Sequence, residues 1–323
     1  MAELWEGATK EEYHADPALS QSAIKDYLKD PQYFFQKHVA KTIPPKDPTP
    51  SQEFGIAIEE TAFTGNLNAQ IIPIEVMQRR NNADGSVSYA KAGPIYKAWE
   101  LQMQAQHGPN VRLYKAEEFA KPMGPGAILQ AVDYLKSHQF AARIIWGETV
   151  RTVRIKWTDP ITGLECRCEI DMLQLAAALI GDLKTTRDPT TYGFARSVAQ
   201  FGYDIQSYYY REALEALAQD RHKLADTELS RAIMPLLERI AAGEQLLCCW
   251  VAVKNSPSYH VEVHPCDADW YSIAGPIVMQ ARQDIADAHR TGHWQTRTFG
   301  TITNMKPPTF AFNRVQELAG TEE

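Results

Sequence analysis

The sequence lacks the long apolar runs that membrane proteins need. No stretch approaches the roughly 18 consecutive apolar residues that indicate a membrane-spanning helix. The opening MAELWEGATKEEYHADP carries acidic residues where a secretory signal would have a basic and then an apolar region. We therefore expect a cytoplasmic protein with no membrane partner.

Cysteine is scarce and poorly spaced for a structural role. The five cysteines are an odd number, and they occur as C-x-C, C-C and one isolated residue. Disulfide frameworks use even numbers, and zinc or iron–sulfur sites prefer paired C-x-x-C spacing. We expect reduced, partly buried thiols at Cys166, Cys168, Cys248, Cys249 and Cys266.

An excess of positive charge is also missing. Lys plus Arg total 33 against 40 for Asp plus Glu, a net charge of −7, which disfavours a protein that coats nucleic acid nonspecifically. A local basic channel is compatible with that total, because net charge says nothing about distribution. G-x-x-x-x-G-K-[ST] and H-E-x-x-H do not occur either, so we expect no ATP-driven motor and assign no histidine a role.

What is present is ordinary globular composition with a change of hydrophobic period along the chain. With 44% hydrophobic and 23% charged residues, the chain can bury a full core. Helical patterns dominate at first, and the period switches to two from Glu148. This order predicts a single α/β domain with a central mixed sheet flanked by helices. Its expected parts are a helical region to about 145, a core over about 146–296 and an irregular tail, 297–323.

Individual elements follow from the same patterns. Four prolines in 41–52 predict a stiff extended connector, and the turn-rich stretch 79–93 predicts a surface loop. Helices are predicted at 18–39 (interrupted at Pro31), from 54 to 65, and at about 91–106, 115–138, 190–219, 225–242 and 267–291. Strands are predicted at 150–157, 164–173, 178–186, 246–253 and 259–263.

The most informative region is CRCEIDMLQLAAALIGDLKTT, two strands joined by a short loop. If they pair as an antiparallel hairpin centred near 176–177, Asp171 lies directly opposite Asp182, and Glu169 and Lys184 project from the same face. Opposed residues have Cα atoms only about 4.5–5.5 Å apart, so the two carboxylates repel unless a cation lies between them. The other face suits a core and holds Cys168, Ile170, Met172 and Leu183.

Mg²⁺ suits such a pair of carboxylates, because it is a hard cation that takes oxygen ligands and keeps several waters. Lys184 lies two residues beyond Asp182 and points the same way, so it can hold a water or a phosphate oxygen. Together these groups supply what phosphodiester hydrolysis needs. A solvated ion pair without function is the alternative interpretation, because D-x-K arises by chance about once in a chain of this size and is usually such a pair.

The sequence resembles a known family at these residues. I-D-M-L…I-G-D-L-K-T-T followed by Q-S-Y-Y-Y is similar to the PD-(D/E)-x-K nuclease superfamily, and within it to the RecE-type (exodeoxyribonuclease VIII) exonucleases of phages and prophages. The LSQSAIKDYLKDPQYF opening, GIAIEETAF and the late WVAVKNSPSYHVEV hairpin also resemble that family's layout. The proline of the superfamily name is replaced here by Ile170.

The resemblance implies roles for particular residues. Asp171 and Asp182 would be metal ligands together with the Leu183 backbone carbonyl, and Lys184 would be the catalytic lysine. RecE-type proteins commonly have a histidine where this chain has Glu59, but lambda-type exonucleases place a glutamate there, so Glu59 would complete a site for two Mg²⁺ ions, with Mn²⁺ as a substitute. The family's Q-x-x-x-Y helix corresponds to Gln206 and Tyr210, which share a helix face.

Basic residues near the hairpin form a further candidate site. Arg154 and Lys156 project from the preceding strand, and with Arg167 and Arg187 they would make a basic strip for DNA beside the acidic residues. Solvated surface charge is an equally good interpretation of each one. Tyr208 and Tyr209 are more typical of a core than of base stacking.

The resemblance further implies a processive 5′→3′ exonuclease that acts on double-stranded DNA ends in a bacterial or phage-infected cell. It would leave 3′ overhangs for a RecT- or Bet-like single-strand annealing partner and form a ring-like homo-oligomer, a trimer or tetramer. The alternatives are an endonuclease, a Cas4-like end-processing nuclease, which would need a four-cysteine cluster, and a nuclease-fold DNA-binding module without catalysis.

Overall fold

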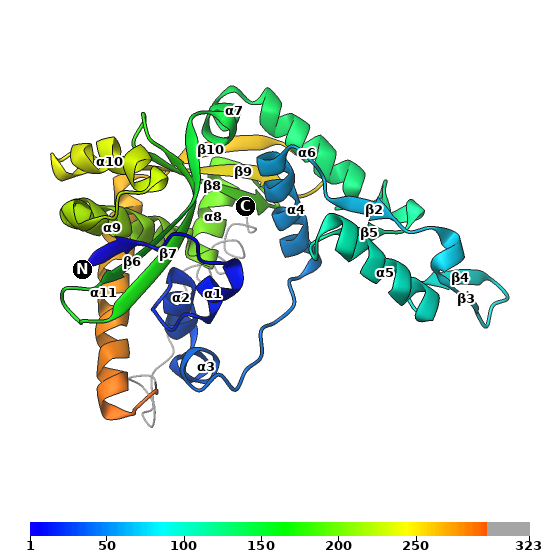
Figure 1. Ribbon diagram of the computed structural model, residues 1–323, viewed down its shortest axis with the longest axis horizontal. Helices are drawn as coiled ribbons and strands as arrows, with labels where there is room; N and C mark the ends of the chain where they lie inside the picture. The colour runs from blue at the N-terminus through cyan, green and yellow to red at the C-terminus, as the bar shows by residue number, and fades with distance from the viewer. Residues whose placement is uncertain (296–323) are drawn as a thin grey trace, which may run out of the picture.

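The computed structural model describes residues 1–295 and is built around one six-stranded sheet (Figure 1). The order is β1-β6-β7-β8-β9-β10; β8 and β9 run parallel, and every other neighbouring pair is antiparallel. The predicted mixed sheet is therefore confirmed. Its strands are β1 (Ala2–Leu4), β6 (Thr149–Thr158), β7 (Glu165–Gln174), β8 (Leu179–Thr186), β9 (Leu247–Lys254) and β10 (Val261–Pro265).

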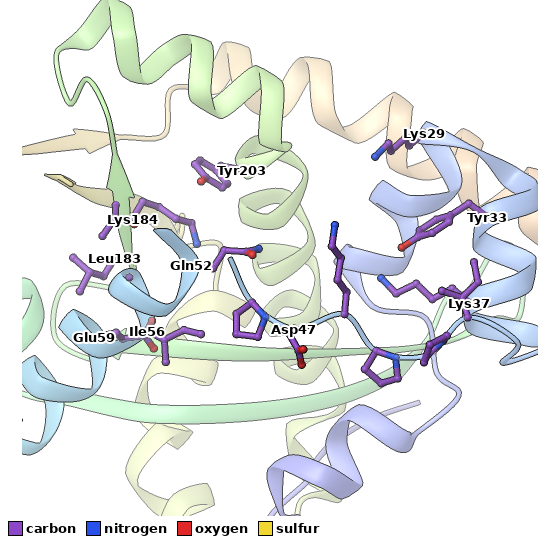
Figure 2. A pocket seen from close by; sticks show the side chains of 17 residues that line it. Lys29, Tyr33, Lys37, Asp47, Gln52, Ile56, Glu59, Leu183, Lys184 and Tyr203 are labelled. Atoms are coloured by element: carbon purple, nitrogen blue, oxygen red, sulfur yellow. The ribbon is translucent and has the colours of Figure 1, made fainter. Parts of the chain in front are cut away.

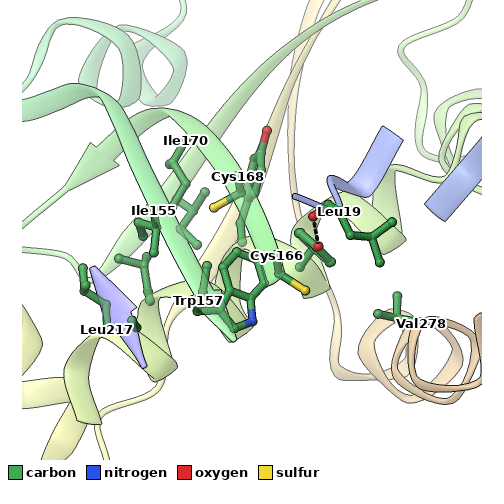
Figure 3. Close-up of a cluster of buried hydrophobic side chains, with 14 of the residues drawn as sticks. Leu19, Ile155, Trp157, Cys166, Cys168, Ile170, Leu217 and Val278 are labelled. Atoms are coloured by element: carbon green, nitrogen blue, oxygen red, sulfur yellow. Dashed lines mark hydrogen bonds between the residues drawn. The ribbon is translucent and has the colours of Figure 1, made fainter. Parts of the chain in front are cut away.

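Helices cover both faces of this sheet. The first face packs against α2 (Gln21–Lys29), α9 (Tyr203–Asp220), α10 (Glu228–Ala241) and α11 (Ala268–Thr291), with α8 (Thr191–Phe201) beside them. Figure 3 shows part of this core, where Trp157, Cys166 and Ile170 meet Leu217 and Val278. The second face packs against α4 (Pro50–Thr64), α6 (Pro125–Ser137) and α7 (Gln139–Trp146).

The cysteines belong to this architecture. All five are free thiols; three are buried and two half-buried, as their spacing predicted. Cys166 and Cys168 lie in the core against α9, where burial raises the pKa of the Cys166 thiol to about 11. None of the helices among residues 1–295 is long and apolar enough to span a bilayer.

The strand alternation is interrupted at one position, next to the predicted site. Thr152 has φ = 58°, a left-handed conformation that β-branched residues rarely adopt, and the pair Thr152–Asp171 is missing from an otherwise continuous β6–β7 ladder. Ile170 therefore packs toward α9, whereas Met172 packs toward α4. The prediction that Cys168, Ile170, Met172 and Leu183 share one face is wrong for this reason: Cys168 and Ile170 lie in one core, Met172 and Leu183 in the other.

Two helical predictions were too long. The stretch 190–219 is split into α8 and α9 by Gly202, which adopts the left-handed φ of 64° and ends α8. The stretch 115–138 begins with a short 3₁₀ turn, η3 (Ala116–Glu118), and α6 starts only at Pro125, because Met123 has φ = 64° and Gly124 precedes the helix.

The predicted loop at 79–93 is a β-hairpin. β3 (Gln78–Asn81) pairs with β4 (Val87–Ala90), and the turn places Gly85 at φ = 81° while the Asp84 carboxylate accepts from the Ser86 amide at 2.9 Å. The turn-rich composition predicted the tip of this hairpin correctly, but it did not indicate the two short exposed strands beside the tip.

The region before residue 145 is not purely helical. It contributes β1 to the central sheet and also forms an arm that projects to the right in Figure 1. The arm contains β2 (Ala69–Ile71), η2 (Ile74–Val76), the β3–β4 hairpin, α5 (Pro94–His107) and β5 (Arg112–Tyr114). The other elements are α1 (Lys10–Ala15), α3 (Pro31–Phe34), a π-helical turn at Phe35–Val39 and η4 (Arg221–Lys223). The predicted tail, 297–323, lies outside the described residues.

Candidate active site

The predicted hairpin places Asp171 and Asp182 at the point where β7 and β8 part. The ladder pairs Gln174 with Leu179, Leu173 with Ile180 and Met172 with Gly181, and it ends there. This is the predicted register, so the two aspartates are the first residues past the last pair. β7 continues along β6 and β8 along β9. The two strands separate here, and the opening leaves room for the carboxylates. A continuous sheet would not provide this room.

Lys184 lies against Asp182. Its Nζ donates to Asp182 Oδ1 at 2.8 Å, and the two side chains are only 17% and 7% exposed. Burial opposes the lysine's charge, but the attraction and hydrogen bond of the Asp182 carboxylate outweigh it, so the pKa of Lys184 is raised. The ammonium also lies 4.9 Å from the centre of the Tyr203 ring, at the start of α9. Lys184 is therefore held as a cation inside the site.

A third carboxylate reaches the site from the other face of the sheet. Glu59 is carried by α4, whose N-terminus is fixed by a capping box at Thr49 and by Pro50 in the first turn. Gly55 lets α4 approach β8 closely, since a Cβ at that position would lie 2.9 Å from Thr185 Oγ1. Burial, opposed by Lys184 and reinforced by Asp182, raises the pKa of Glu59 to about 7.

Asp171 has the least favourable surroundings for a negative charge. Burial, followed by the nearby Glu59 and Asp182 carboxylates, raises its pKa well above the usual value. Lys184 acts in the opposite direction but is already paired with Asp182. Three carboxylates therefore interact electrostatically with Lys184 and with one another.

Gln206 and Tyr210 lie next to each other on α9, on the side of the sheet opposite α4. Both are buried, and Gln206 Nε2 donates to the Tyr210 hydroxyl at 2.8 Å, one helical turn along α9. Burial, with Asp171 and Asp182 nearby, raises the pKa of Tyr210 well above its usual value. Tyr209, by contrast, is a core residue whose hydroxyl donates to the Leu19 carbonyl.

Leu183 lies between the two charged residues of β8. Its side chain packs toward α4 in the second core, and its backbone follows the parallel ladder opposite Val251. Its carbonyl remains a predicted ligand.

The predicted basic strip is compensated by the N-terminal segment and by Glu169 of β7. Arg154 donates to Glu169 at 2.5 Å, Lys156 to Asp16 at 2.6 Å, and Arg167 to the Ala18 carbonyl at 3.0 Å. Aromatic rings add to this: the Lys156 ammonium lies 3.7 Å from the centre of the Trp5 ring, and the Arg167 guanidinium 4.4 Å from that of Tyr13. Only Arg187, just past β8, is exposed and outside any ion pair among residues 1–295.

A cleft of about 1230 Å³ opens beside the site. Figure 2 shows Lys184, Leu183 and Glu59 on one side and Lys29, Tyr33 and Lys37 of the α2–α3 region on the other. The proline-rich connector, with Asp47, runs along the cleft between them. Lys46 of the connector also lines the cleft. The lysines of α2 were not predicted as site residues, because nothing in the helical pattern of 18–39 indicates that α2 faces the hairpin.

The chemistry of the site matches a hard divalent cation. In the described part of the chain no group of three His, Cys, Asp or Glu side chains is placed to hold a metal ion. Mg²⁺, however, is usually held by one or two carboxylates together with water and substrate phosphates. Asp182 Oδ2 is buried and accepts no hydrogen bond, although Lys184 Nζ lies 2.7 Å away. The chemistry of Asp171 and Asp182 therefore fits a hard divalent cation such as Mg²⁺.

Comparisons with known proteins support a nuclease-like fold. Residues 95–225 match a protein family described as a PDDEXK-like domain of unknown function (DUF3799). A crystal structure of a candidate exonuclease from Eubacterium rectale resembles the whole fold, with a TM-score of 0.56 and 13% sequence identity over 96% of this chain and 98% of that chain. No curated protein matches the chain.

Residues 95–225 thus resemble a PDDEXK-like domain, and the fold of the chain resembles that of a candidate exonuclease. The family match includes β6, β7, β8, α8 and α9, and therefore the whole Asp171–Asp182–Lys184 set. It supports membership of the PD-(D/E)XK nuclease superfamily and does not select the RecE-type branch.

Proposed function

We propose that this protein is a Mg²⁺-dependent exodeoxyribonuclease that acts on the ends of double-stranded DNA. The observation that carries the proposal is the group of Asp171, Asp182 and Glu59 around Lys184, at one end of a cleft lined by further lysines. Perturbed carboxylates gathered in a cleft are typical of catalytic sites. Neighbouring lysines supply the positive field that a polyanionic substrate needs.

The roles of the residues follow from their positions. Lys184, held as a cation, would exchange its hydrogen bond to Asp182 for one to a phosphate oxygen and so stabilise the charge that develops there. The carboxylates of Asp171 and Asp182, with Glu59 and the Leu183 carbonyl, would hold the metal. When bound, Mg²⁺ would provide an acidified water and neutralise charge on the phosphate. Gln206 and Tyr210 would keep the α9 side of the site rigid through their mutual hydrogen bond.

Arg154, Lys156, Arg167 and Arg187 remain proposals as DNA contacts. Arg187 is exposed and ready to meet a phosphate, whereas the first three would have to exchange existing partners for DNA. We therefore give Arg187 the most direct role among them.

The finer features of the activity rest on the resemblance to the RecE-type exonucleases. They are 5′→3′ polarity, production of 3′ overhangs, a ring-like trimer or tetramer, and a single-strand annealing protein as partner. A ring would reconcile a net charge of −7 with a basic inner surface. Light scattering coupled to gel filtration measures the subunit number directly.

Cleavage of end-labelled linear duplex against covalently closed circular duplex, with and without Mg²⁺, tests the proposal. We expect degradation of linear DNA only, dependent on Mg²⁺, with release of a 5′ label before a 3′ label. Cutting of closed circles would identify an endonuclease. Binding without cleavage at any divalent metal would identify a DNA-binding module and overturn the proposal.

A further inference from the structure

The helix α2 carries a lysine that none of the assignments above uses. Lys25 and Lys29 are four residues apart and therefore share a face of α2. Lys29 lines the cleft together with Lys184 and Tyr203. Lys25 lies one turn earlier in α2, against the turn that begins α9, and its charge interacts with Lys184 and Asp182.

The stem of Lys25 crosses the turn between α8 and α9. A Cβ added at Gly202 would lie 2.8 Å from Lys25 Cδ and 3.3 Å from its Cγ. Gly202 thus serves two purposes, because it also adopts the left-handed φ of 64° that ends α8. Tyr203, the next residue, lies against Lys184. The α8–α9 turn is therefore placed between the two lysines.

Lys25 is half-buried and makes no hydrogen bond or ion pair within residues 1–295. The acids around it already have partners: Asp182 accepts from Lys184 at 2.8 Å, and Asp26 contacts both Lys37 and His38 at 2.8 Å. Asp204, at the start of α9, forms no ion pair with it. A lysine that is desolvated without a partner is costly for the fold.

Lys25 and Lys184 differ in whether a nearby carboxylate compensates the cost of burying the ammonium charge. Burial, followed by repulsion from Lys184, lowers the pKa of Lys25 to about 8, although Asp182 and Asp204 act in the opposite direction. The pKa of Lys184 is raised by its Asp182 partner. If Lys25 served as an internal counter-ion for the aspartates, its environment would favour its charge as that of Lys184 does.

We propose that Lys25 binds a phosphate of the DNA strand in the cleft, from the α2 side, and so positions the neighbouring phosphodiester against Lys184. The proposal rests on the nuclease function proposed above. It assigns Lys25 as a positioning residue: the DNA backbone supplies the anion that the protein itself does not, and α2 becomes the second wall of the substrate path, opposite α4.

The experiment compares DNA binding in an Asp171→Asn background, in which cleavage is removed and Lys25 keeps its surroundings. The affinity for an end-labelled linear duplex is measured by fluorescence anisotropy over a KCl series with Mg²⁺. Each phosphate contact contributes about 0.9 to the slope of log K against log salt. Lys25→Met, which keeps most of the apolar stem, should therefore lower the slope by about one, and Lys25→Arg should restore it.

Two further measurements separate this role from a structural one. Lys223→Met removes an exposed lysine that pairs with Asp220 far along α9 and η4, and it should leave the slope unchanged. In the active enzyme, Lys25→Met should lower kcat/KM about 10–100-fold, with recovery in Lys25→Arg. A merely structural lysine would change the melting temperature and leave the slope as it was, which would overturn the proposal.

Failure of the proposal and failure of the proposed function give different results. If Lys25→Met folds and binds with an unchanged slope, Lys25 contacts no phosphate, whereas the nuclease assignment stands. If Lys25→Met is unfolded, Lys25→Gln is measured in its place, and unfolding of both neutral variants makes Lys25 a folding residue and overturns the proposal. If the Asp171→Asn parent shows no salt-dependent binding and the wild type no cleavage, the nuclease function itself fails.

Discussion

Charged side chains occur at both ends of the β6–β8 region of the sheet, and the two ends differ in whether these side chains have partners of opposite charge. At the β6–β7 end, basic residues meet acids or carbonyls: Arg154 with Glu169, Lys156 with Asp16, and Arg167 with the Ala18 carbonyl. At the β7–β8 opening, three carboxylates share one lysine. The first arrangement completes the fold, whereas the second leaves more buried carboxylates than the single lysine can pair with.

The difference teaches how to distinguish structural from functional charge in this fold. Compensated groups lie between two parts of the chain, here the N-terminal segment and the sheet, and they fasten one to the other. Uncompensated groups lie where the ladder ends, and the pKa values of Asp171 and Glu59 are raised because burial and like charges disfavour ionisation. Perturbation of this kind persists in proteins mainly where function requires it.

The largest expected effect is loss of the lysine at the uncompensated end. Lys184→Ala should lower the rate of duplex degradation by about 10²–10³-fold or more, because the cation that faces the phosphate is removed. Asp182→Ala should do the same. Initial rates on end-labelled linear DNA measure the effect, and circular dichroism verifies that both variants are folded.

A matched lysine sharpens this prediction. Lys223→Ala removes the same side chain from an exposed ion pair with Asp220, and we expect its rate to stay within about threefold of wild type. If Lys184→Ala were as active as Lys223→Ala, the comparison between the two ends of the sheet would carry no functional meaning.

Metal removal should act only at the uncompensated end. EDTA is expected to abolish cleavage, and excess Mg²⁺ or Mn²⁺ to restore it. In a thermal melt, Mg²⁺ should raise the melting temperature of the wild type by mass action and should do so much less in Asp171→Asn. An equal rise in both proteins would mean that the ion binds elsewhere.

The pH dependence of stability offers a subtler test. The folded-state pKa of Glu59 is raised from 4.5 to about 7. The protonated carboxyl therefore adds to the free energy of unfolding, relative to the ionised form. This contribution is fully present below pH 4.5 and is lost as the pH rises to about 7. Glu59→Gln abolishes this loss. In EDTA, its melting temperature relative to wild type should therefore increase by a few degrees across that window. A difference that is independent of pH, or that falls with rising pH, would contradict the assignment.

The smallest effect on activity, combined with a clear effect on stability, is expected at the compensated end. Asp16→Ala removes the partner of Lys156 and an acid 3.7 Å from Arg167, and it should cost about 1–3 kcal/mol of unfolding free energy. Urea denaturation measures that cost, and the cleavage rate should remain within about threefold. A large loss of rate without loss of stability would place the N-terminal segment in the catalytic machinery.

The local parts of this site could be predicted from the sequence. Alternation and the length of the turn give the β7–β8 register, because both strands and their connection lie within twenty-odd residues and each side chain's face depends on its neighbours. The resemblance of I-D-M-L…I-G-D-L-K-T-T to known nucleases added Glu59, Gln206 and Tyr210. In the structure Glu59 and Tyr210 lie near the aspartates, and Gln206 is hydrogen-bonded to Tyr210.

The remaining features depend on tertiary contacts that no local pattern records. The left-handed Thr152 interrupts the alternation and sends Met172 to the opposite core from Ile170. Asp16 and Tyr13 compensate the basic strip from well over a hundred residues away in the chain. Lys25 reaches the α8–α9 turn only because α2 packs against α9. Each of these features depends on the folded chain and not on a local sequence pattern.

The most direct test of the central claim is a crystal structure with Mn²⁺ and thymidine 5′-monophosphate, in which anomalous scattering locates the ion. We predict a peak bound by the carboxylates of Asp171 and Asp182, with Lys184 Nζ moved from Asp182 to a phosphate oxygen. A peak at any other group of side chains, or an unchanged Lys184–Asp182 pair without an ion beside it, would contradict the account.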